Sequence, residues 1–300
     1  RFGARGDRVN GLQGDAADYV FSLIRDHQIE CEAVQSGTLT VVRHPKSVAK
    51  LRAKYDHWAR LGKAVRWVER ADMGDYIGSD AFAAAILFED GGHLNPMGFC
   101  RGLAAAAMKA GALIHGKSPA TALERRGGRW RITTPGGRVT ANTVLLATNA
   151  HRNGLWPALD NAFYIVRSAG VATDPLPEDV RRAVLPRDNN VQELHHPRYF
   201  YFYFDGEGRL LTGGGAGLGI DQSVEQVGAW VGKELSRLFP DLGRLHFKHY
   251  WQGLLDMSPS RFPGVHRLSD NLYTAIGFSG RGVPTATAVG RDIAALPITG

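Results

Sequence analysis

Cysteine is scarce in this sequence. The chain has 2 cysteines among 300 residues, Cys31 and Cys100, and they stand too far apart for a metal-binding or redox motif. We interpret both as buried free thiols, which is typical of a cytosolic protein and predicts a cytoplasmic location. No metal site is expected.

Long hydrophobic segments are missing as well. The longest apolar run, "AFAAAILF" at residues 81–88, has the length of a strand, whereas a membrane-spanning helix needs about 20 apolar residues. The chain opens with the polar stretch "RFGARGDRVNG", which does not resemble a signal peptide. We therefore expect no membrane span.

Clusters of basic residues are absent, although the formal net charge is +7. The arginines and lysines are dispersed along the chain, whereas a nucleic-acid-binding protein usually gathers them in a patch. The charge therefore predicts a positive field that attracts an anionic cofactor or substrate, and it predicts no nucleic-acid partner.

The dinucleotide-binding fingerprint is a further absence. The motif Gly-x-Gly-x-x-Gly opens the first helix of a Rossmann fold and holds a pyrophosphate there. The glycine clusters "GGGAGLG" at 213–219 and "GFSGRG" at 277–282 do not have this spacing. No hydrophobic strand precedes the first predicted helix. An NAD(P)-linked dehydrogenase is therefore not favoured.

The periodicity of the apolar residues predicts a mixed α/β (α+β) protein. Helices are expected at residues 15–28, 46–62, 96–109 and 224–239. Strands are expected at residues 37–43, 112–115, 138–150, 164–173, 198–204, 209–214, 247–255 and 271–277, with a hairpin over 120–137 that turns at Gly127 and Gly128.

Residues 199–204 alternate tyrosine and phenylalanine. In a strand this pattern puts the tyrosine hydroxyls on one face and the phenylalanine rings on the other. With the neighbouring strands it predicts an antiparallel sheet with one face open to water. That face is either the wall of a pocket or the outside of an ordinary amphipathic sheet.

The stretch "GFSGRGVPTATAVGRDIA" at residues 277–294 has the pattern of a glycine-rich turn followed by a helix of small residues. Gly277, Gly280 and Gly282 let the backbone approach a ligand closely, and Pro284 suits the first helical turn. A helix N-terminus offers unpaired N–H groups and a partial positive charge. The stretch is therefore either a cradle for an anionic group or a tight turn before a closely packed helix.

Four blocks of the sequence carry a family resemblance. They are "GGHLNPMGFCRGLAAAAMKAGALIH", "VLLATNAHRNGLWPAL", "YWQGLLDMSPSRFPGV" and "NLYTAIGFSGRGVPTATAVGRDIA". In this order they resemble the D-amino-acid oxidase-like flavoproteins, which include glycine oxidase, sarcosine oxidase and γ-glutamylputrescine oxidase. The likeness spans essentially the whole chain, and "ATNA" with "LWP" after it is most similar to the γ-glutamylputrescine oxidase-like branch.

The resemblance implies a FAD/NAD(P)-binding-type domain and a second domain, built on an antiparallel sheet, that binds the substrate. We assign residues 1–35, 91–150 and 266–300 to the FAD-binding domain and residues 36–90 and 151–265 to the substrate-binding domain. Family members begin with a βαβ unit that carries the fingerprint, so we expect a chain truncated after that unit. Such a chain should bind FAD weakly or not at all, and its exposed surface should favour homo-oligomers.

The cofactor implied by the resemblance is FAD. In relatives the turn at 277–283 lines the pyrimidine edge of the flavin ring, and the strand end at 147–150 runs past the adenosine-pyrophosphate region. The residues assigned to the cofactor are Ala120, Thr148, Asn149, Ala150, Phe278, Ser279, Gly280, Arg281, Gly282 and Val283. A plain strand end remains the alternative for the second region.

The reaction implied by the resemblance removes a hydride from the carbon that bears an amine, passes it to flavin N5 and hydrolyses the imine. Orientation and desolvation carry most of this chemistry, so no catalytic residue is identified. The residues placed near the substrate are His93, Trp251, Gln252 and Arg261, although lone histidines and arginines are often solvated surface groups.

The substrate class follows from a departure from the family pattern. Amino-acid-specific relatives hold the substrate carboxylate with an arginine just after the "GL" of the third block, where this chain has Leu255 and Asp256. An amine or an ω-amino compound is therefore favoured as the substrate over an α-amino acid. The favoured function is an FAD-dependent amine or amino-acid oxidoreductase, and the alternative is a flavin-less structural or binding module.

Overall fold

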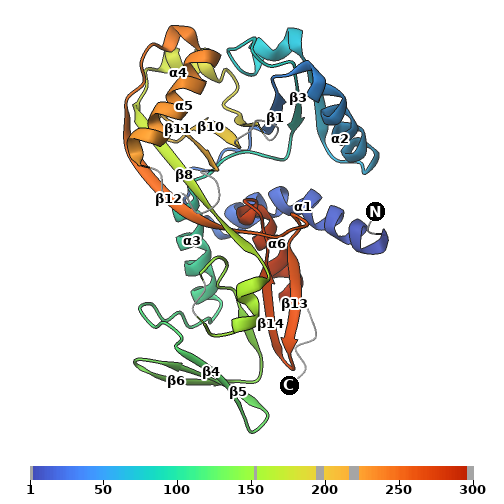
Figure 1. Cartoon of the computed structure of the whole chain (residues 1–300), viewed down its shortest axis with the longest axis vertical. Coiled ribbons are helices and arrows are strands. Elements are labelled where there is room, and N and C mark those ends of the chain that lie inside the picture. The colour runs from blue at the N-terminus through green and yellow to red at the C-terminus, as the bar shows by residue number, and fades with distance from the viewer. Residues whose placement is uncertain (1–2, 152–153, 194–198, 216–222, 296–300) are drawn as a thin grey trace. The chain divides into compact units, whose positions relative to one another are not determined.

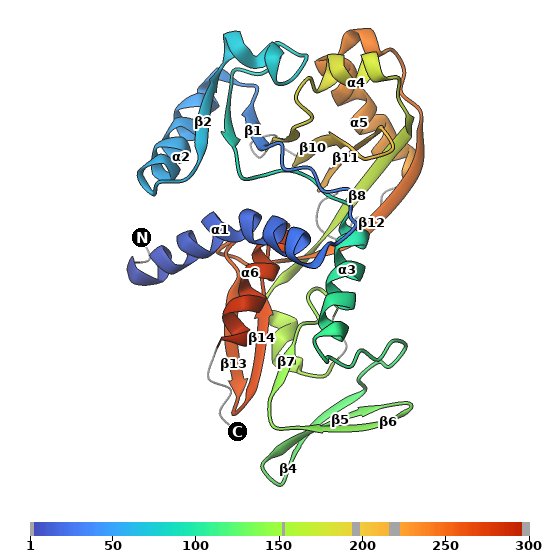
Figure 2. The same ribbon diagram turned by 180° about the vertical axis from the view of Figure 1, so that it is seen from behind.

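The computed structural model describes residues 3–151, 154–193, 199–215 and 223–295. The chain forms two compact units, each built from segments that are separated in sequence. Unit 1 comprises Arg1–Leu23, Cys100–Val166 and Leu254–Gly300, and unit 2 comprises Ile24–Phe99 and Arg167–Gly253. Figures 1 and 2 follow the chain from opposite sides.

The predicted domain boundaries differ from these units in four segments. Residues 24–35 and 91–99 were assigned to the FAD-binding domain and lie in unit 2, whereas residues 151–166 and 254–265 were assigned to the substrate-binding domain and lie in unit 1. The identification of unit 1 with the cofactor and of unit 2 with the substrate stays a proposal.

Unit 2 is built on an eight-stranded sheet with the order β12-β8-β11-β10-β9-β1-β3-β2. Its strands are β1 (Thr38–Val42), β2 (Val65–Glu69), β3 (Ala84–Phe88), β8 (Tyr164–Pro175), β9 (Asn190–Glu193), β10 (Phe200–Phe204), β11 (Arg209–Gly215) and β12 (Phe247–Met257). The ladders from β8 to β9 are antiparallel, as predicted, whereas β1 and β9 run parallel.

The core of unit 2 lies on the phenylalanine face of this sheet. Phe200, Phe202 and Phe204 are all buried, and the helix α5 (Val224–Leu238) packs on them through Val231 and Leu235. Ser223 and Gln226 form a capping box that fixes the start of α5. The predicted alternation is confirmed, because Tyr201 and Tyr203 lie on the opposite face and remain partly exposed.

Smaller helices complete unit 2. The helix α2 (Val48–Arg60) packs Leu51 against Ile86 of β3 and Val42 of β1. The helix α4 (Glu178–Val184) adds Val184 to the main core. Short 3-10 turns precede α2 and follow β2. None of the described helices is long and apolar enough to cross a membrane.

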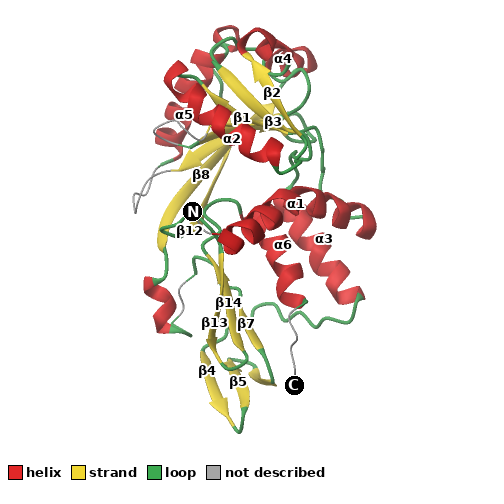
Figure 3. Ribbon diagram, turned by 90° about the vertical axis from the view of Figure 1, so that its right-hand side faces the viewer, coloured by secondary structure: helices red, strands yellow, loops and turns green. Residues whose placement is uncertain are grey.

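Unit 1 contains two three-stranded sheets. One has the order β13-β14-β7 and consists of β7 (Val144–Leu146), β13 (Gly264–Ser269) and β14 (Leu272–Ile276). The other is a meander of β4 (Ala122–Arg126), β5 (Arg129–Thr134) and β6 (Gly137–Ala141). The helix α6 (Gly282–Ala294) lies beside the first sheet, together with parts of α1 (Gly3–His27) and α3 (Pro96–Lys109) (Figure 3).

Most of the predicted helices and strands are confirmed, but the helix predicted to begin at residue 15 begins at Gly3, and two of the predicted strands are wrong. Residues 138–150 form two strands, β6 and β7, and not one. Residues 112–115 form no strand, and Leu113 and Ile114 are 86% and 53% exposed. Their apolar composition favours a strand, but none of the described strands forms a ladder with them, and a strand needs such a partner. Cys100 is exposed, so only Cys31 is the buried thiol that was expected.

Candidate functional site

Two adjacent parallel strands of unit 1 end at the same edge of their sheet. β7 and β14 pair in parallel, with Leu146 opposite Thr274. The buried Thr274 hydroxyl donates a hydrogen bond of 2.8 Å to the Leu146 carbonyl, which fixes this register. Ligand sites in open α/β sheets lie beyond the carboxyl ends of parallel strands. The segments that follow these strands, 147–151 and 277–283, therefore form the candidate ligand site.

A buried carboxylate, Asp256 at the end of β12, holds the turn that follows β14. Its side chain is 1% exposed. Oδ2 accepts a hydrogen bond from the Gly277 N–H at 2.5 Å, and Oδ1 accepts one from the Phe278 N–H at 3.2 Å. The Asp256 carbonyl accepts the Ser279 N–H at 3.0 Å. Burial raises the pKa of Asp256, and these N–H donors oppose that rise.

The remaining backbone donors of the turn are open. Arg281 donates its N–H to the Phe278 carbonyl, but within the described part of the chain no acceptor pairs with the N–H groups of Gly280, Gly282 or Val283. No side chain caps α6, and its first turn carries no acid. The start of α6 therefore offers three donors and the positive end of a helix dipole.

The backbone of this edge adopts left-handed conformations at several positions. Gly277 and Gly280 have φ of 81° and 80°, and the non-glycine residues Asn149 and Ser279 have φ of 50° and 54°. A Cβ on Gly280 would approach only Leu255, at 3.7 Å. The protein leaves space above Gly280, and the positive φ disfavours any side chain there. Such conformations cluster at ligand sites.

The loop that follows β12 is tied to the same turn. The Ser258 N–H donates a hydrogen bond of 3.3 Å to the Ser279 Oγ. The Ser258 hydroxyl donates one of 2.8 Å to the Phe262 carbonyl. Arg281 donates through Nη2 to the Arg261 carbonyl at 2.5 Å. Desolvation, and secondarily the charge of Arg261, lower the pKa of Arg281. The turn thus has two guanidinium groups beside it.

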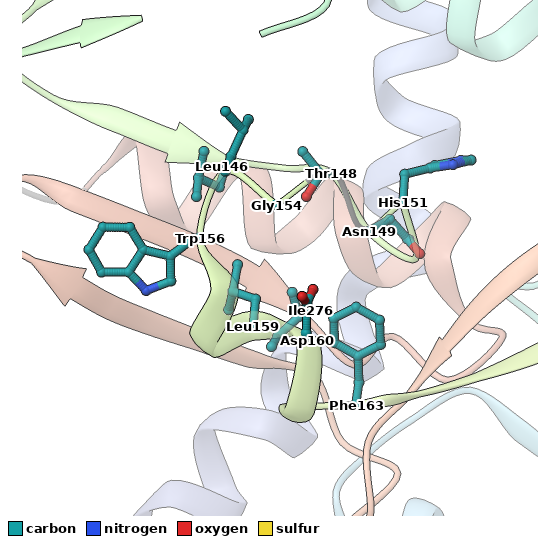
Figure 4. Close-up of a pocket in the computed structure, with 11 residues that line it drawn as sticks. Leu146, Thr148, Asn149, His151, Gly154, Trp156, Leu159, Asp160, Phe163 and Ile276 are labelled. Carbon is teal, nitrogen blue, oxygen red and sulfur yellow. The ribbon is translucent and has the colours of Figure 1, made fainter. Parts of the chain in front are cut away.

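The loop after β7 lines a small pocket in unit 1. Thr148 and Asn149 face it together with Ile276 of β14, and the 3-10 turn η3 (Pro157–Asn161) closes its other side (Figure 4). The Asn149 side chain accepts the Ala150 N–H at 2.5 Å. Ala150 itself is buried. Ala120 does not line this pocket; it lies shortly before β4, a strand of the other sheet of unit 1.

In unit 2, a row of residues crosses the face of the sheet that carries the tyrosines. Successive partners in this row are Thr40, Gln192, Tyr201, Gly213 and Gly170. Tyr203, two residues after Tyr201 in β10, lies on the same face of the sheet. We call this face the tyrosine face. Gln192 donates to the Thr40 hydroxyl at 3.1 Å. Burial raises the pKa of Tyr201 to about 12 and that of Tyr203 further.

Glycine makes room for Trp251 on the tyrosine face. A Cβ on Gly170 would lie 2.4 Å from the indole ring of Trp251, and one on Gly213 would lie 3.0 Å from the hydroxyl of Tyr201. The indole therefore rests directly on the backbone of β8 while 41% of Trp251 stays exposed. Its neighbour Gln252 donates to the hydroxyl of Tyr250.

His93 is a buried residue of unit 2. Its ring lies 5.2 Å from that of Tyr203, and Nε2 lies 3.2 Å from the Asp188 carbonyl. Its backbone forms a bridge with Val34. His93 and Trp251 thus both touch the tyrosine face, whereas Arg261 belongs to unit 1. A role for these residues in substrate binding stays a prediction.

Two components of these sites were not predicted from the sequence. Asp256 was noted only as a departure from the family pattern, and its contacts with a turn 21 residues later in the chain have no local signal. Gly170 and Gly213 were not singled out, since their function depends on strand pairing. No group of three or more His, Cys, Asp or Glu residues that could hold a metal ion occurs within the described ranges.

Comparison with known proteins gives a consistent family. Residues 2–296 match the family described as "FAD dependent oxidoreductase". The chain is 28% identical over 296 residues to the γ-glutamylputrescine oxidoreductase of Escherichia coli K12, which covers 96% of this chain and 67% of that protein. It is 26% identical over 249 residues to the glycine oxidase of Bacillus subtilis, covering 78% of this chain and 62% of that protein.

Solved structures agree on the fold. The glycine oxidase of Geobacillus kaustophilus superposes with a TM-score of 0.77 at 18% identity, over 92% of this chain and 75% of that one. The chain spans about two thirds of the length of its curated relatives, 67%, 65% and 67% in three of them.

Proposed function

Because the chain belongs to the family of FAD-dependent oxidoreductases, with FAD as the cofactor, we propose that it oxidises the C–N bond of an amine or an amino acid. The chemistry supplied by bound FAD would be that of a hydride acceptor for the carbon that carries the nitrogen. The residues of this chain bind and orient the two reactants, and the following observations support the proposal.

The observation that carries the proposal is the set of open donors at the start of α6. The N–H groups of Gly280, Gly282 and Val283 find no acceptor within the described part of the chain. The pyrimidine edge of a flavin ring has carbonyl oxygens and gains negative charge on reduction. The donors and the helix dipole match the carbonyl oxygens and the negative charge of this edge in sign, so the residues present fit one end of FAD.

Gly280 is the position that lets the ring approach. Its φ of 80° and the space above it leave the backbone without a side chain at the turn. We assign Phe278, Ser279 and Arg281 to the frame of the turn, because their N–H groups are all used within the protein. The direct donors to the ring are then a subset of the residues predicted from the sequence.

The tyrosine face of unit 2 is the proposed surface for the substrate. The side chains placed on it are aromatic or uncharged, and none is arginine or lysine. Leu255 and Asp256 occupy the stretch in which an amino-acid-specific relative would have its carboxylate-binding arginine, and Asp256 is buried under the turn of unit 1. Aromatic rings and tyrosine hydroxyls suit an alkyl amine better than they suit an α-carboxylate.

A reductive half-reaction tests the proposal. The FAD-loaded protein is mixed without oxygen with simple amines, ω-amino acids or α-amino acids, and the flavin absorbance at about 450 nm is followed. We expect bleaching by amines or ω-amino acids and little by α-amino acids. Bleaching by α-amino acids alone would reject the substrate class, and a FAD-loaded protein that none of these compounds bleaches would reject the proposed reaction.

A further inference from the structure

Three carboxylates are buried in the described part of the chain, and they are neutralised in two different ways. Glu193 and Glu234 of unit 2 both contact the guanidinium of Arg43, at 2.8 Å and 2.5 Å. Asp256 of unit 1 instead accepts backbone N–H groups from Gly277 and Phe278. A buried charge costs free energy unless it is paired or hydrogen-bonded. The buried carboxylate of Asp256 is therefore stabilised by the backbone of a single turn, residues 277–278.

Asp256 divides the donors of that turn into two sets. Its side chain and carbonyl take the N–H groups of residues 277–279, which point back toward β12. Gly280, Gly282 and Val283 keep their N–H groups free of protein acceptors in the described part of the chain. The carboxylate thereby determines which donors can reach a ligand and which cannot.

A left-handed residue marks the point where the two sets meet. Ser279 has φ of 54° and Gly280 has φ of 80°. A non-glycine residue pays a conformational penalty in this region and stays there only when its surroundings impose it. The bond from the Ser279 N–H to the Asp256 carbonyl and the Ser279 hydroxyl contact with Ser258 impose it here.

We propose that Asp256 is a positioning residue for the cofactor: it holds the 277–279 backbone so that the N–H groups of Gly280, Gly282 and Val283 face the flavin ring. The inference rests on the proposed function of the turn. It assigns to Asp256 no contact with FAD or substrate.

Two neutral variants separate hydrogen bonding from charge. Asp256→Asn keeps one acceptor oxygen, and Asp256→Leu keeps none, while both remove the negative charge. A difference between the two variants therefore reports the acceptor and not the loss of charge. A third variant, Leu272→Ala, empties a fully buried position at the opposite end of β14 and controls for loss of stability alone.

The first measurement is amide hydrogen exchange in the cofactor-free chain. We expect the N–H groups of residues 277–279 to exchange slowly and those of Gly280, Gly282 and Val283 to exchange fast. Each lost hydrogen bond should speed the exchange of its own amide by about tenfold. The protection of Gly277 and Phe278 should therefore be partly lost in Asp256→Asn, fully lost in Asp256→Leu and kept in Leu272→Ala. Ser279 donates to the backbone carbonyl of Asp256, so its protection should be kept in all three variants. Unchanged protection of Gly277 and Phe278 in Asp256→Leu would overturn the proposal.

The second measurement is the dissociation constant of FAD, taken well below the unfolding temperature of every variant. We expect affinity to fall about tenfold in Asp256→Asn and further in Asp256→Leu, with little change in Leu272→Ala. Equal losses in all three variants would reduce Asp256 to a stabilising residue and overturn the inference. The sequence predicts weak FAD binding for a chain without the fingerprint. If the wild-type chain binds no FAD, the exchange pattern decides whether Asp256 holds the turn.

Discussion

The two candidate binding surfaces of this protein differ in the groups that they offer to a ligand: one offers backbone N–H groups and the other offers side chains. The turn at 277–283 in unit 1 offers backbone N–H groups, and its side chains serve mainly to hold the backbone in place. The tyrosine face in unit 2 offers side chains, among them Tyr201 and Trp251, which pack against the backbone at glycine positions of the sheet. Recognition by backbone tolerates many sequences, whereas recognition by side chains changes with every substitution.

This difference has a functional meaning. A cofactor shared by a whole family needs the same donors in every member, and backbone geometry supplies them at the cost of a few glycines. A substrate differs from one member to the next, and side chains on a rigid sheet can be exchanged without changing the fold. Four predictions follow, each for a substitution in one of the two units, ordered from the largest expected effect to the smallest.

The largest effect is expected from Arg43→Met in unit 2. This change removes the cation between the buried carboxylates Glu193 and Glu234 and should cost about 3–5 kcal/mol in the free energy of unfolding. Denaturant unfolding followed by the fluorescence of Trp230, which packs on Phe200 in the core of unit 2, measures it.

The matched control for this prediction is Arg237→Met. Arg237 also contacts Glu234, but its side chain is 58% exposed, so the loss should stay below about 1 kcal/mol. Equal losses in the two variants would contradict the assignment of Arg43 as the partner of the buried pair.

Gly280→Val should weaken FAD binding with little loss of secondary structure. A β-branched residue at φ of 80° costs about 1–3 kcal/mol, and its side chain would occupy the space proposed for the ring. We expect at least about a tenfold rise in the dissociation constant, measured by FAD fluorescence titration with circular dichroism as the check on folding. Gly290→Ala, farther along α6, is the control, since a Cβ there meets no atom within 4 Å. Unchanged affinity in Gly280→Val would move the ring elsewhere.

Gly170→Ala should displace Trp251 from the tyrosine face. The added Cβ would lie 2.4 Å from the indole, and relieving this overlap should cost about 1–3 kcal/mol. The expected result is a shift in tryptophan fluorescence that is absent when Trp251 is first replaced by phenylalanine. Gly253→Ala, where a Cβ meets open space, should leave the spectrum unchanged. A silent Gly170→Ala would show that the indole does not rest on β8 in solution.

The smallest effect concerns the ionisation of Tyr201. Burial raises its pKa from 10.0 to about 12, so the neutral phenol is favoured in the folded state. The stability from this group is complete below pH 10 and is lost as the pH rises toward 12. In an alkaline titration of phenolate absorbance, Tyr201→Phe should remove a late transition that the exposed-tyrosine variant Tyr164→Phe retains. Loss of an early transition in Tyr201→Phe would place this hydroxyl in water.

The sequence predicted the elements that have a strong local pattern. Amphipathic periodicity and a terminal glycine marked α2, and the tyrosine–phenylalanine alternation assigned each face of β10 correctly. Residues 112–115 show the limit of this reasoning. Their apolar character is that of a strand, but a strand exists only with a neighbour, and neighbours are not encoded locally.

The candidate sites divide in the same way. Glycine spacing and Pro284 pointed to the turn before α6, because backbone geometry has a composition signal. Asp256 has no such signal, since an aspartate in "GLLDMS" is indistinguishable from a solvated one until β12 and the turn are brought together. The contact of Trp251 with Gly170 likewise becomes visible only once β12 and β8 lie next to each other in the sheet.

The pairing of β7 with β14 also bears on how the molecule folds. Residues 144–146 must find residues 272–274, and most of the chain between them belongs to unit 2. Contacts of such long sequence separation slow folding, because loop closure precedes any gain. Folding of unit 2 first would shorten this search, since the chain enters it along β8 and leaves it along β12, which are neighbours in one sheet. A slow phase for unit 1 that vanishes once unit 2 is formed is the kinetic consequence of this connectivity.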